Sequence, residues 1–414
     1  MQLMGGVMAK IILPTSFRTV TVGLSAFKMI FREVWSLLTM FQQIYLLFAS
    51  PFSETETELQ LVHVLFRHGQ RTPADTYPTD PYINYTFEPV GWGQLTNSGK
   101  LAQYHQGQYL RARYNKFLGA LYSPEIIVAQ STDVDRTKMS AQLELAGLWP
   151  PAPSQQWNPD LLWQPIPLHS EPLERDSLLL VRVPCPKYQY ERNNVKASTE
   201  VRNILAAYNA TELYQVLAEK TGTTYQDPDD VQSLYSTLKA EEDFNLTLPE
   251  WTNGIYPNRL IPLTVFSFVL NAYNTELQKL KGGPLLKKII SDTKEKVEGT
   301  QTSVRRKMFM YAGHDSTISN LLSALNVWDP QIPGYGIMVL IELHHNKETG
   351  HHIKLFLRNT TDHDPYPLTI PGCDTACPLD QFRKLTDPVV PRDWKISCVV
   401  DDPNYKPPPP AAAP

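Results

Sequence analysis

The sequence is short of charge and of cysteine. Only 19 % of its 414 residues are charged, 38 Lys and Arg stand against 42 Asp and Glu, and no long run of like charge occurs. A protein that binds nucleic acid through its phosphates needs a basic surface, so this composition argues against that class. No internal repeat is evident. The chain is 42 % hydrophobic and contains 35 prolines, which predicts a folded globular protein with many rigid loops.

Long apolar stretches are also scarce, since only one is present. Residues 34–52 carry no charge, follow basic residues, and end in small residues before the polar sequence SETETE, which is typical of a secretory signal. An uncleaved membrane anchor is the alternative, because about 20 apolar residues can span a bilayer. The long segment before this stretch suggests Met29 as another start. We expect residues 1–53 to be an N-terminal extension with this signal or anchor, and residues 401–414 to be a proline-rich tail without a membrane anchor.

Two further features agree with passage through the secretory pathway. The four cysteines form an even set, and in an oxidising compartment they allow three pairings. We favour Cys373 with Cys377, across the turn PGCDTAC, and Cys185 with Cys398. A zinc site agrees less well, because the spacing Cys-x3-Cys is not the usual one for zinc ligands. The other feature is a set of four N-x-[ST] glycosylation sequons: Asn84, Asn209, Asn245 and Asn359.

Strand-like and helix-like segments alternate in both ends of the chain. The short run Leu59–Phe66 (LQLVHVLF) is almost wholly apolar, which predicts a strand buried on both faces, with His63 as a core residue. Thr96 is suited to cap a helix that reaches about Tyr114. Similar patterns predict strands over 125–130 and 307–312, a helix over 136–148, a helix after the third strand, and a hairpin formed by 336–343 and 351–357.

This alternation predicts an α/β fold with a mixed, mostly parallel central sheet and helices on both faces. Residues 151–299 differ, because they contain mainly amphipathic helical segments and proline-rich loops. We therefore predict a main α/β domain built from residues 54–150 and 300–400, into which residues 151–299 are inserted as a smaller α-rich cap.

Charged side chains gather where the predicted strands end. In open α/β sheets, ligands bind outside the carboxyl ends of the strands, so these side chains should meet in one crevice. Arginine forks beside helix N-termini suit phosphate oxygens. A histidine among them can attack phosphorus, and a carboxyl group can protonate the leaving alkoxide. The residues follow the three strands in turn: Arg67, His68 and Arg71, then Arg136, then His314 and Asp315.

The motifs around these residues resemble those of the histidine acid phosphatases. They are RHGQRTP at 67–73, followed by DTYPTDPY, then STDVDRT at 131–137 and GHDSTISNLL at 313–322. The likeness continues through NPDLLWQPIPLH at 158–169, LRNTTDHDPYPLTIPGC and DPVVPRDWKISC, and it covers about residues 58–400. It is greatest to the lysosomal, prostatic and insect venom members.

The resemblance implies a phosphoglycerate mutase-like fold and an acid phosphatase that uses no cofactor and no metal. Position by position, it implies that His68 is the nucleophile and becomes phosphohistidine. It further implies that His314 stabilises the transition state, that Asp315 is the proton donor, and that the phosphate is bound by three arginines: Arg67, Arg71 and Arg136.

Two other functions remain open at this point. A phosphotransferase related to phosphoglycerate mutase would share an Arg-His-Gly histidine but would be cytosolic. A secreted binding or allergen-type protein would keep the pocket without the activity. We predict an enzyme that is secreted or lysosomal and acts on small phosphate monoesters or phosphoproteins, not on nucleic acid. We also expect a homodimer contact around Trp163 to His169.

Overall fold

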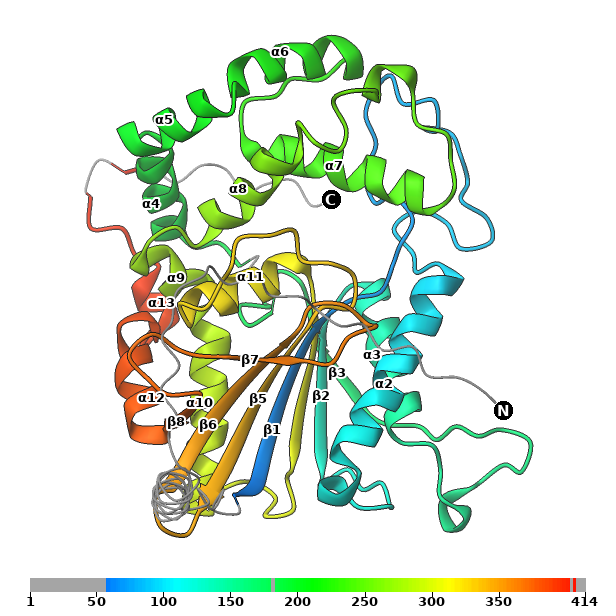
Figure 1. Cartoon of the computed structure of the whole chain (residues 1–414), viewed down its shortest axis with the longest axis vertical. Helices are drawn as coiled ribbons and strands as arrows, with labels where there is room; N and C mark the ends of the chain where they lie inside the picture. Colours follow the sequence, from blue (N-terminus) through cyan, green and yellow to red (C-terminus); the bar gives the residue numbers. More distant parts are fainter. Residues whose placement is uncertain (1–56, 180–182, 403–404, 407–414) are drawn as a thin grey trace, which may run out of the picture. The chain divides into compact units, whose positions relative to one another are not determined.

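A mixed sheet of eight strands lies at the centre of the part of the chain that the structure describes (Figure 1). The computed structural model describes residues 57–179, 183–402 and 405–406, so the predicted signal segment 34–52 and most of the tail lie outside the described residues. The mixed α/β architecture predicted from the sequence is confirmed. The strands are β1 (Glu58–Arg67), β2 (Ile127–Thr132), β3 (Leu168–Glu171), β4 (Met308–Gly313), β5 (Met338–Asn346), β6 (Gly350–Arg358), β7 (Tyr366–Leu368) and β8 (Ala376–Pro378).

The sheet has a parallel half and an antiparallel half. In the parallel half, β3, β2, β4 and β1 are neighbours in that order. β5 pairs with the other side of β1 in the antiparallel sense, and the antiparallel half continues through β6 to β7 and β8. The predicted hairpin is β5 and β6. The carboxyl ends of β1, β2 and β4 therefore lie at one edge of the sheet.

Different helices cover the two faces of the sheet. Val62, Val64 and Phe66 of β1 pack on the side of α2 (Asn97–Leu118) and α3 (Asp135–Leu148). Leu61 and Leu65 pack on the side of α10 (Gly283–Glu298), α11 (Asp315–Ala324) and α12 (Leu379–Thr386). Because side chains alternate along a strand, β1 contributes to a hydrophobic core on each face. Figure 1 shows α2 and α3 on one side of the sheet and α10 on the other.

His63 is a core residue, as predicted. It is 2 % exposed, its ring stacks on that of Phe309 with centroids 5.2 Å apart, and its Nε2 lies 3.3 Å from Thr293 Oγ1. Burial, and to a smaller extent the charge of Lys288, lower the pKa of His63 to about 3. The folded protein therefore holds this imidazole neutral.

The observed elements begin and end within a few residues of the predicted ones. Thr96 caps α2, since its hydroxyl accepts a hydrogen bond from Gly99 N–H at 3.0 Å. The helix continues one turn beyond Tyr114, because Leu118 is buried in the core beneath it. The second strand begins at Ile127, since the residues before it form a turn.

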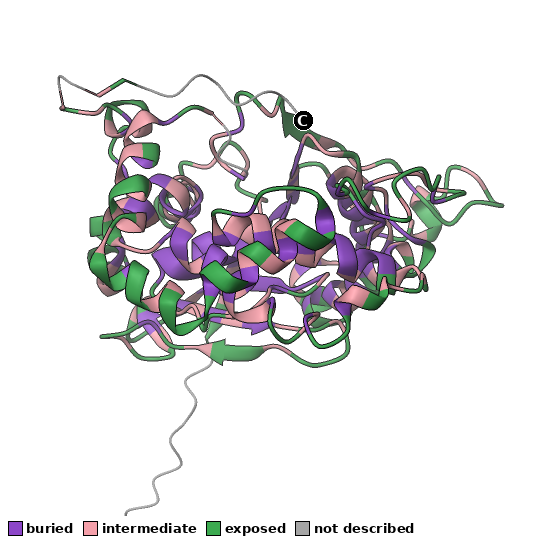
Figure 2. Cartoon of the chain, turned by 90° about the horizontal axis from the view of Figure 1, so that it is seen from above, coloured by how far each residue is buried: buried purple, intermediate pink, exposed green. Residues whose placement is uncertain are grey.

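A group of helices forms a cap over the edge where β1, β2 and β4 end (Figure 1). Leu213, Val231 and Leu263 belong to a separate core within this group. Figure 2, a view from above, shows buried residues mainly in the middle of the described part of the chain and exposed residues on its outer segments. The helices of the cap are α4 (Pro186–Lys196), α5 (Thr199–Ala207), α6 (Ala210–Thr221), α7 (Pro228–Asp243) and α8 (Ile261–Asn271), with the short 3-10 turn Glu250–Thr252 between the last two. The helix α9 (Thr275–Lys281) follows the cap.

The predicted cap segment 151–299 also contains elements that belong with the sheet. β3 pairs with β2 and extends the sheet, and α10 packs on one of its faces. The helix α10, which packs on the sheet, has an amphipathic pattern similar to those of the cap helices. The sequence pattern alone therefore did not show where the cap ends. We propose that the cap consists of residues 186–271.

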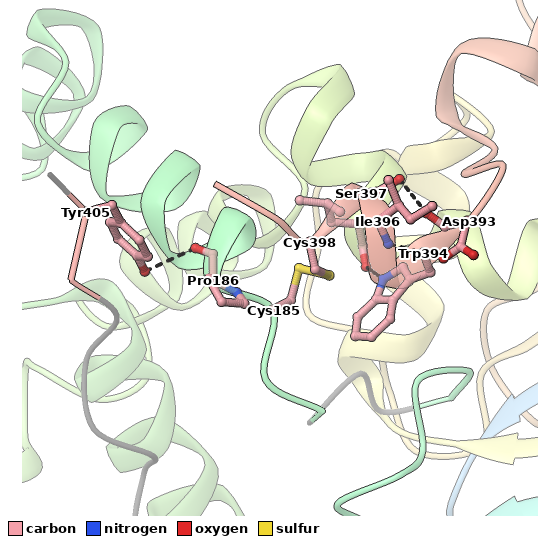
Figure 3. The surroundings of a disulfide bond; sticks show 9 residues. Cys185, Pro186, Asp393, Trp394, Ile396, Ser397, Cys398 and Tyr405 are labelled. Carbon is pink, nitrogen blue, oxygen red and sulfur yellow. Dashed lines mark hydrogen bonds between the residues drawn. A yellow bond between two sulfur atoms is a disulfide. The ribbon is translucent and has the colours of Figure 1, made fainter. Parts of the chain in front are cut away.

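Two disulfides occur among the described residues. Cys185–Cys398 joins the start of α4 to α13 (Trp394–Ser397), and beside it the hydroxyl of Tyr405 donates to the carbonyl of the residue after Cys185 at 3.2 Å (Figure 3). Cys373–Cys377 closes the turn that leads into β8. These are the two pairings that the sequence analysis favours. No helix within the described ranges is long and apolar enough to cross a membrane.

Candidate active site

The register of the parallel strands brings three segments of the sequence to one place. Arg67, the last residue of β1, pairs with Gly313 at the end of β4, and Ala312 pairs with Ser131 near the end of β2. Residues that directly follow these strands therefore lie together at the edge beneath the cap. A cavity of about 200 Å³ lies there, and all six predicted site residues line it: Arg67, His68, Arg71, Arg136, His314 and Asp315.

One ring nitrogen of His68 is free of a proton. Nδ1 lies 2.8 Å from the Gly69 carbonyl oxygen, which can only accept, so Nδ1 carries the proton. Nε2 is then the unprotonated nitrogen, and Arg136 Nε donates to it at 3.2 Å. Burial, followed by the positive charges of Arg136 and Arg67, holds the pKa of His68 well below its ordinary value of 6.5. Burial and the neighbouring charges therefore favour the neutral form of this imidazole.

The backbone that holds His68 is itself fixed by close packing. A Cβ at Gly69 would lie 2.6 Å from the Gly99 carbonyl oxygen in the first turn of α2, a separation that no side chain tolerates. Gly69 N–H donates to Ser140 Oγ of α3 at 3.1 Å. The glycine after the histidine is thus required by the approach of the loop to α2. Its peptide is anchored to α3, and its carbonyl in turn sets the proton position on His68.

Asp315 forms an ion pair with one of the arginines. Its Oδ2 lies 3.0 Å from Arg67 Nη2, and its Oδ1 accepts a hydrogen bond from Ser316 N–H at 2.8 Å. Burial alone would raise the pKa of this carboxyl group. The charges of Arg67 and His314, together with that hydrogen bond, outweigh burial, and the pKa of Asp315 lies below its ordinary value. Without a bound anion, Asp315 is therefore ionised.

His314 lies between the ends of β2 and β4. Its Nε2 is 2.9 Å from Thr132 Oγ1, and its ring lies edge-on to that of His68 with centroids 5.5 Å apart. Its backbone N–H donates to Thr317 Oγ1 at 3.0 Å, at the start of α11. The ring is thereby held beside His68, and the hydroxyl of Thr132 orients it.

The cavity carries an excess of positive charge. Arg71 is held by a hydrogen bond from Nη1 to the Thr72 carbonyl oxygen at 3.0 Å, and Arg136 lies in the first turn of α3. Burial and the neighbouring charge of Arg71 lower the pKa of Arg136 to about 10, so it is still a cation at neutral and acid pH. Three arginines against two lining carboxylates, Asp75 and Asp315, make a site for an anion.

A family model described as the histidine phosphatase superfamily (branch 2) matches residues 58–358. The chain belongs to this superfamily. It is 40 % identical to human prostatic acid phosphatase over 83 % of its length and 88 % of that protein's. It is 39 % identical to a venom acid phosphatase of Apis mellifera, with the same coverage, and 38 % identical to human lysosomal acid phosphatase over 82 % of this chain and 80 % of that one.

Solved structures of phytases share the fold of this histidine phosphatase. The phytase of Klebsiella sp. ASR1 superposes with a TM-score of 0.61 at 18 % identity, over 84 % of this chain and all of the other. The Hafnia alvei phytase gives a TM-score of 0.61 at 17 % identity, over 83 % and 98 %. At this level of identity, the likeness to the two phytases shows a shared fold and nothing more.

The site of this histidine phosphatase has a wall that the sequence analysis missed. Gln232, Ser236 and Thr237 of the cap helix α7 line the cavity, together with Asp75 from the loop after Arg71. Thr237 Oγ1 donates to the Asp75 carbonyl oxygen at 3.1 Å, so the loop and the cap are joined there. No motif marks the three residues of α7, and Asp75, the first residue of DTYPTDPY, received no role from the sequence. The amphipathic pattern predicts a helix but not which of its polar residues face the strands.

Proposed function

We propose that this protein is an acid phosphatase that hydrolyses phosphate monoesters in two displacements at His68. In the first, Nε2 attacks phosphorus, the ester P–O bond breaks, and the leaving oxygen takes a proton from Asp315. In the second, water attacks the phosphohistidine, Asp315 takes a proton from that water, and the P–N bond breaks to release phosphate. The neutral His68 with its proton on Nδ1 is the observation that carries this proposal, because it leaves Nε2 ready to attack.

The arginines supply the charge that the reaction needs. Negative charge on the equatorial oxygens of the transferring phosphoryl group is met by Arg67, Arg71 and Arg136 in a partly enclosed site, where preorganised charges act strongly. His314, beside the nucleophile, adds a further donor for the same oxygens. Its hydrogen bond with Thr132 fixes its orientation.

Asp315 must gain a proton before it can act as an acid, and substrate binding supplies the reason. The phosphate competes with Asp315 for Arg67, so the anion weakens the ion pair that keeps the pKa of Asp315 low. A bound dianion or monoanion also repels the carboxylate. Both effects raise the pKa of Asp315 when substrate is present, and acid pH then favours the protonated form.

The test is the variant His68→Ala, assayed with p-nitrophenyl phosphate at pH 5. We expect turnover to fall more than about a thousandfold, since the group that forms the covalent bond is gone. Labelled phosphohistidine, trapped by quenching in alkali, should appear only in the wild type. His105→Ala, at an exposed position on α2, is the matched control and should stay active. Activity of His68→Ala within tenfold of the wild type would overturn the mechanism.

We further propose that the protein is a glycoprotein of the secretory pathway, secreted or lysosomal. Asn84, Asn209 and Asn245 lie in exposed positions and Asn359 is half-buried, so oligosaccharyltransferase and the glycan have room at the first three at least. The two disulfides agree with an oxidising compartment. Digestion with an endoglycosidase, followed by mass spectrometry of the four sequon peptides, tests this proposal.

We also propose a homodimer through residues 157–169. Trp157, Leu162 and Trp163 are exposed by 59 %, 71 % and 41 %, an apolar surface that association would remove from water. The adjoining strand β3 lies at the edge of the sheet among the described strands. A second copy of the chain could therefore cover the exposed loop and contact the sheet edge at the same time.

A further inference from the structure

A second cavity adjoins the phosphate site. It has a volume of about 180 Å³ and shares Arg67, Asp315, Gln232 and Ser236 with the first cavity. Its other walls come from the cap helices α7 and α8 and from the loop at 332–335, which carries Tyr335. The two cavities therefore adjoin each other between the cap and the strand ends.

The position of Asp315 tells which part of a substrate enters this second cavity. In the proposed reaction the phosphoryl group lies among the arginines, and the leaving oxygen lies at the carboxyl group that protonates it. Asp315 lines both cavities. The group attached to the leaving oxygen must therefore extend past Asp315, on the side where the second cavity lies.

The walls of the second cavity are mainly apolar and aromatic. Phe268 of α8 is 3 % exposed, and Tyr235 of α7 lines the same space. Tyr335 is fixed by the guanidinium of Arg67, whose Cζ lies 4.4 Å from the centre of the tyrosine ring. The ammonium of Lys239, at the margin, is paired with Asp243 at 2.5 Å. A leaving group in this space meets mostly ring and alkyl surface.

We propose that Tyr235, Phe268 and Tyr335 form a leaving-group subsite that selects phosphate monoesters of compact aromatic alcohols. This proposal rests on the proposed function. An apolar cavity of about 150 Å³ can hold benzene, so a cavity of about 180 Å³ has room for a group the size of one aromatic ring. Polar side chains also line this space, among them Gln232, Ser236 and Thr264, but most of its surface is apolar, which favours an aromatic ring over a polyol.

The experiment compares phenyl phosphate with glycerol 2-phosphate in the wild type and in Phe268→Ala. We expect the variant to lose about 10- to 100-fold in kcat/KM on phenyl phosphate and little on glycerol 2-phosphate, as the loss of apolar contact with one ring predicts. The different reactivities of the two esters cancel, because each variant is compared with the wild type on the same substrate. Equal losses on both substrates would overturn the subsite.

A matched control lies on the same helix. Phe266 is 6 % exposed but packs with Val201 and Leu270, away from the cavity. Phe266→Ala should therefore lower thermal stability as Phe268→Ala does, without changing the preference between the two substrates. Tyr235→Ala, at a half-buried position, is the second variant of the subsite and keeps the test possible if Phe268→Ala does not fold.

Inhibition gives a measurement that does not depend on turnover of either ester. Phenylphosphonate should fill both cavities, whereas inorganic phosphate fills only the first. We expect Phe268→Ala and Tyr235→Ala to raise the inhibition constant of phenylphosphonate at least fivefold and to leave that of inorganic phosphate unchanged. Unchanged inhibition by phenylphosphonate would exclude the subsite while the proposed function stands. A wild type that hydrolyses neither ester would overturn the proposed function, and the subsite with it.

Discussion

Asp315 Oδ2 and Arg67 Nη2 lie 3.0 Å apart, so the proposed proton donor is paired with one of the cations proposed to bind the phosphate. The arrangement couples two events. Until an anion arrives, Arg67 holds the pKa of Asp315 low and the carboxylate cannot give a proton. An anion that draws Arg67 toward itself weakens the effect of Arg67 on Asp315, so the pKa of Asp315 rises. The acid would thus be generated by the binding of the group that needs it.

The first prediction separates proton donation from the other steps. Asp315→Asn should lose about 10² to 10⁴ in rate on glycerol 2-phosphate, whose alkoxide needs the proton, and far less on p-nitrophenyl phosphate, whose phenolate leaves without help. Steady-state kinetics on both substrates measure the difference. Asn keeps the size of the side chain and can still accept the hydrogen bond from Ser316 N–H, so the fold should be unaffected. Equal losses on the two esters would move the role to another group.

The same variant makes a second, independent prediction about Arg67. With a neutral amide in place of the carboxylate, Arg67 is no longer held in an ion pair and repulsion of the anion by Asp315 is gone. Inorganic phosphate should therefore inhibit Asp315→Asn more strongly than it inhibits the wild type, by about tenfold if the pair contributes about 1.4 kcal/mol. Weaker inhibition would show that Asp315 does not compete with the anion for Arg67.

A prediction about metal removal follows from the charges in the cavity. In the proposed reaction, Arg67, Arg71 and Arg136 supply the positive charge that a divalent cation supplies in metal-dependent phosphoryl transfer. Dialysis against EDTA should therefore leave the activity on p-nitrophenyl phosphate within about twofold. Loss of activity that zinc or magnesium restores would show that a metal ion is needed in addition to the three arginines.

The sequence was sufficient to predict the site residues at the strand ends, but it was not sufficient to predict which cap residues line the site. Arg67 and His68 could be placed because a short apolar strand precedes them and parallel strands end at one edge. The hydrogen bond between His68 Nδ1 and the Gly69 carbonyl was not foreseeable, since it depends on how closely Gly69 approaches α2. Tyr235 and Phe268 lie outside the motifs, in patterns typical of any core helix. Only the tertiary packing brings them beside Asp315.

The proposed dimer contact predicts a change of molecular mass. Leu162→Asp places a charge on the exposed apolar loop, and it should convert a dimer to a monomer in light scattering after gel filtration, with activity retained. Val304→Asp is the matched control, because Val304 is 76 % exposed and lies on another loop. A wild type that is monomeric at micromolar concentration, or a control that dissociates equally, would contradict the proposed contact.

The last prediction concerns stability in acid, where an acid phosphatase works. The pKa of His63 is lowered to about 3 in the folded protein, against an ordinary value of 6.5. Between these values the unfolded chain binds a proton that the folded chain does not, so stability falls as pH decreases below 6.5. One pKa unit corresponds to 1.36 kcal/mol, and the cost at pH 5 is therefore about 2 kcal/mol.

Replacing the titrating group should remove this cost. His63→Gln keeps a polar side chain that can still reach Thr293 Oγ1, although it loses the ring that stacks on Phe309. The variant is expected to be less stable than the wild type at pH 7 and to lose about 2 kcal/mol less between pH 7 and pH 5, as measured by urea unfolding at each pH. His105→Gln, at an exposed position on α2, should keep the pH dependence of the wild type. If His63→Gln and the wild type lost the same stability over this range, the acid sensitivity would have to come from other groups.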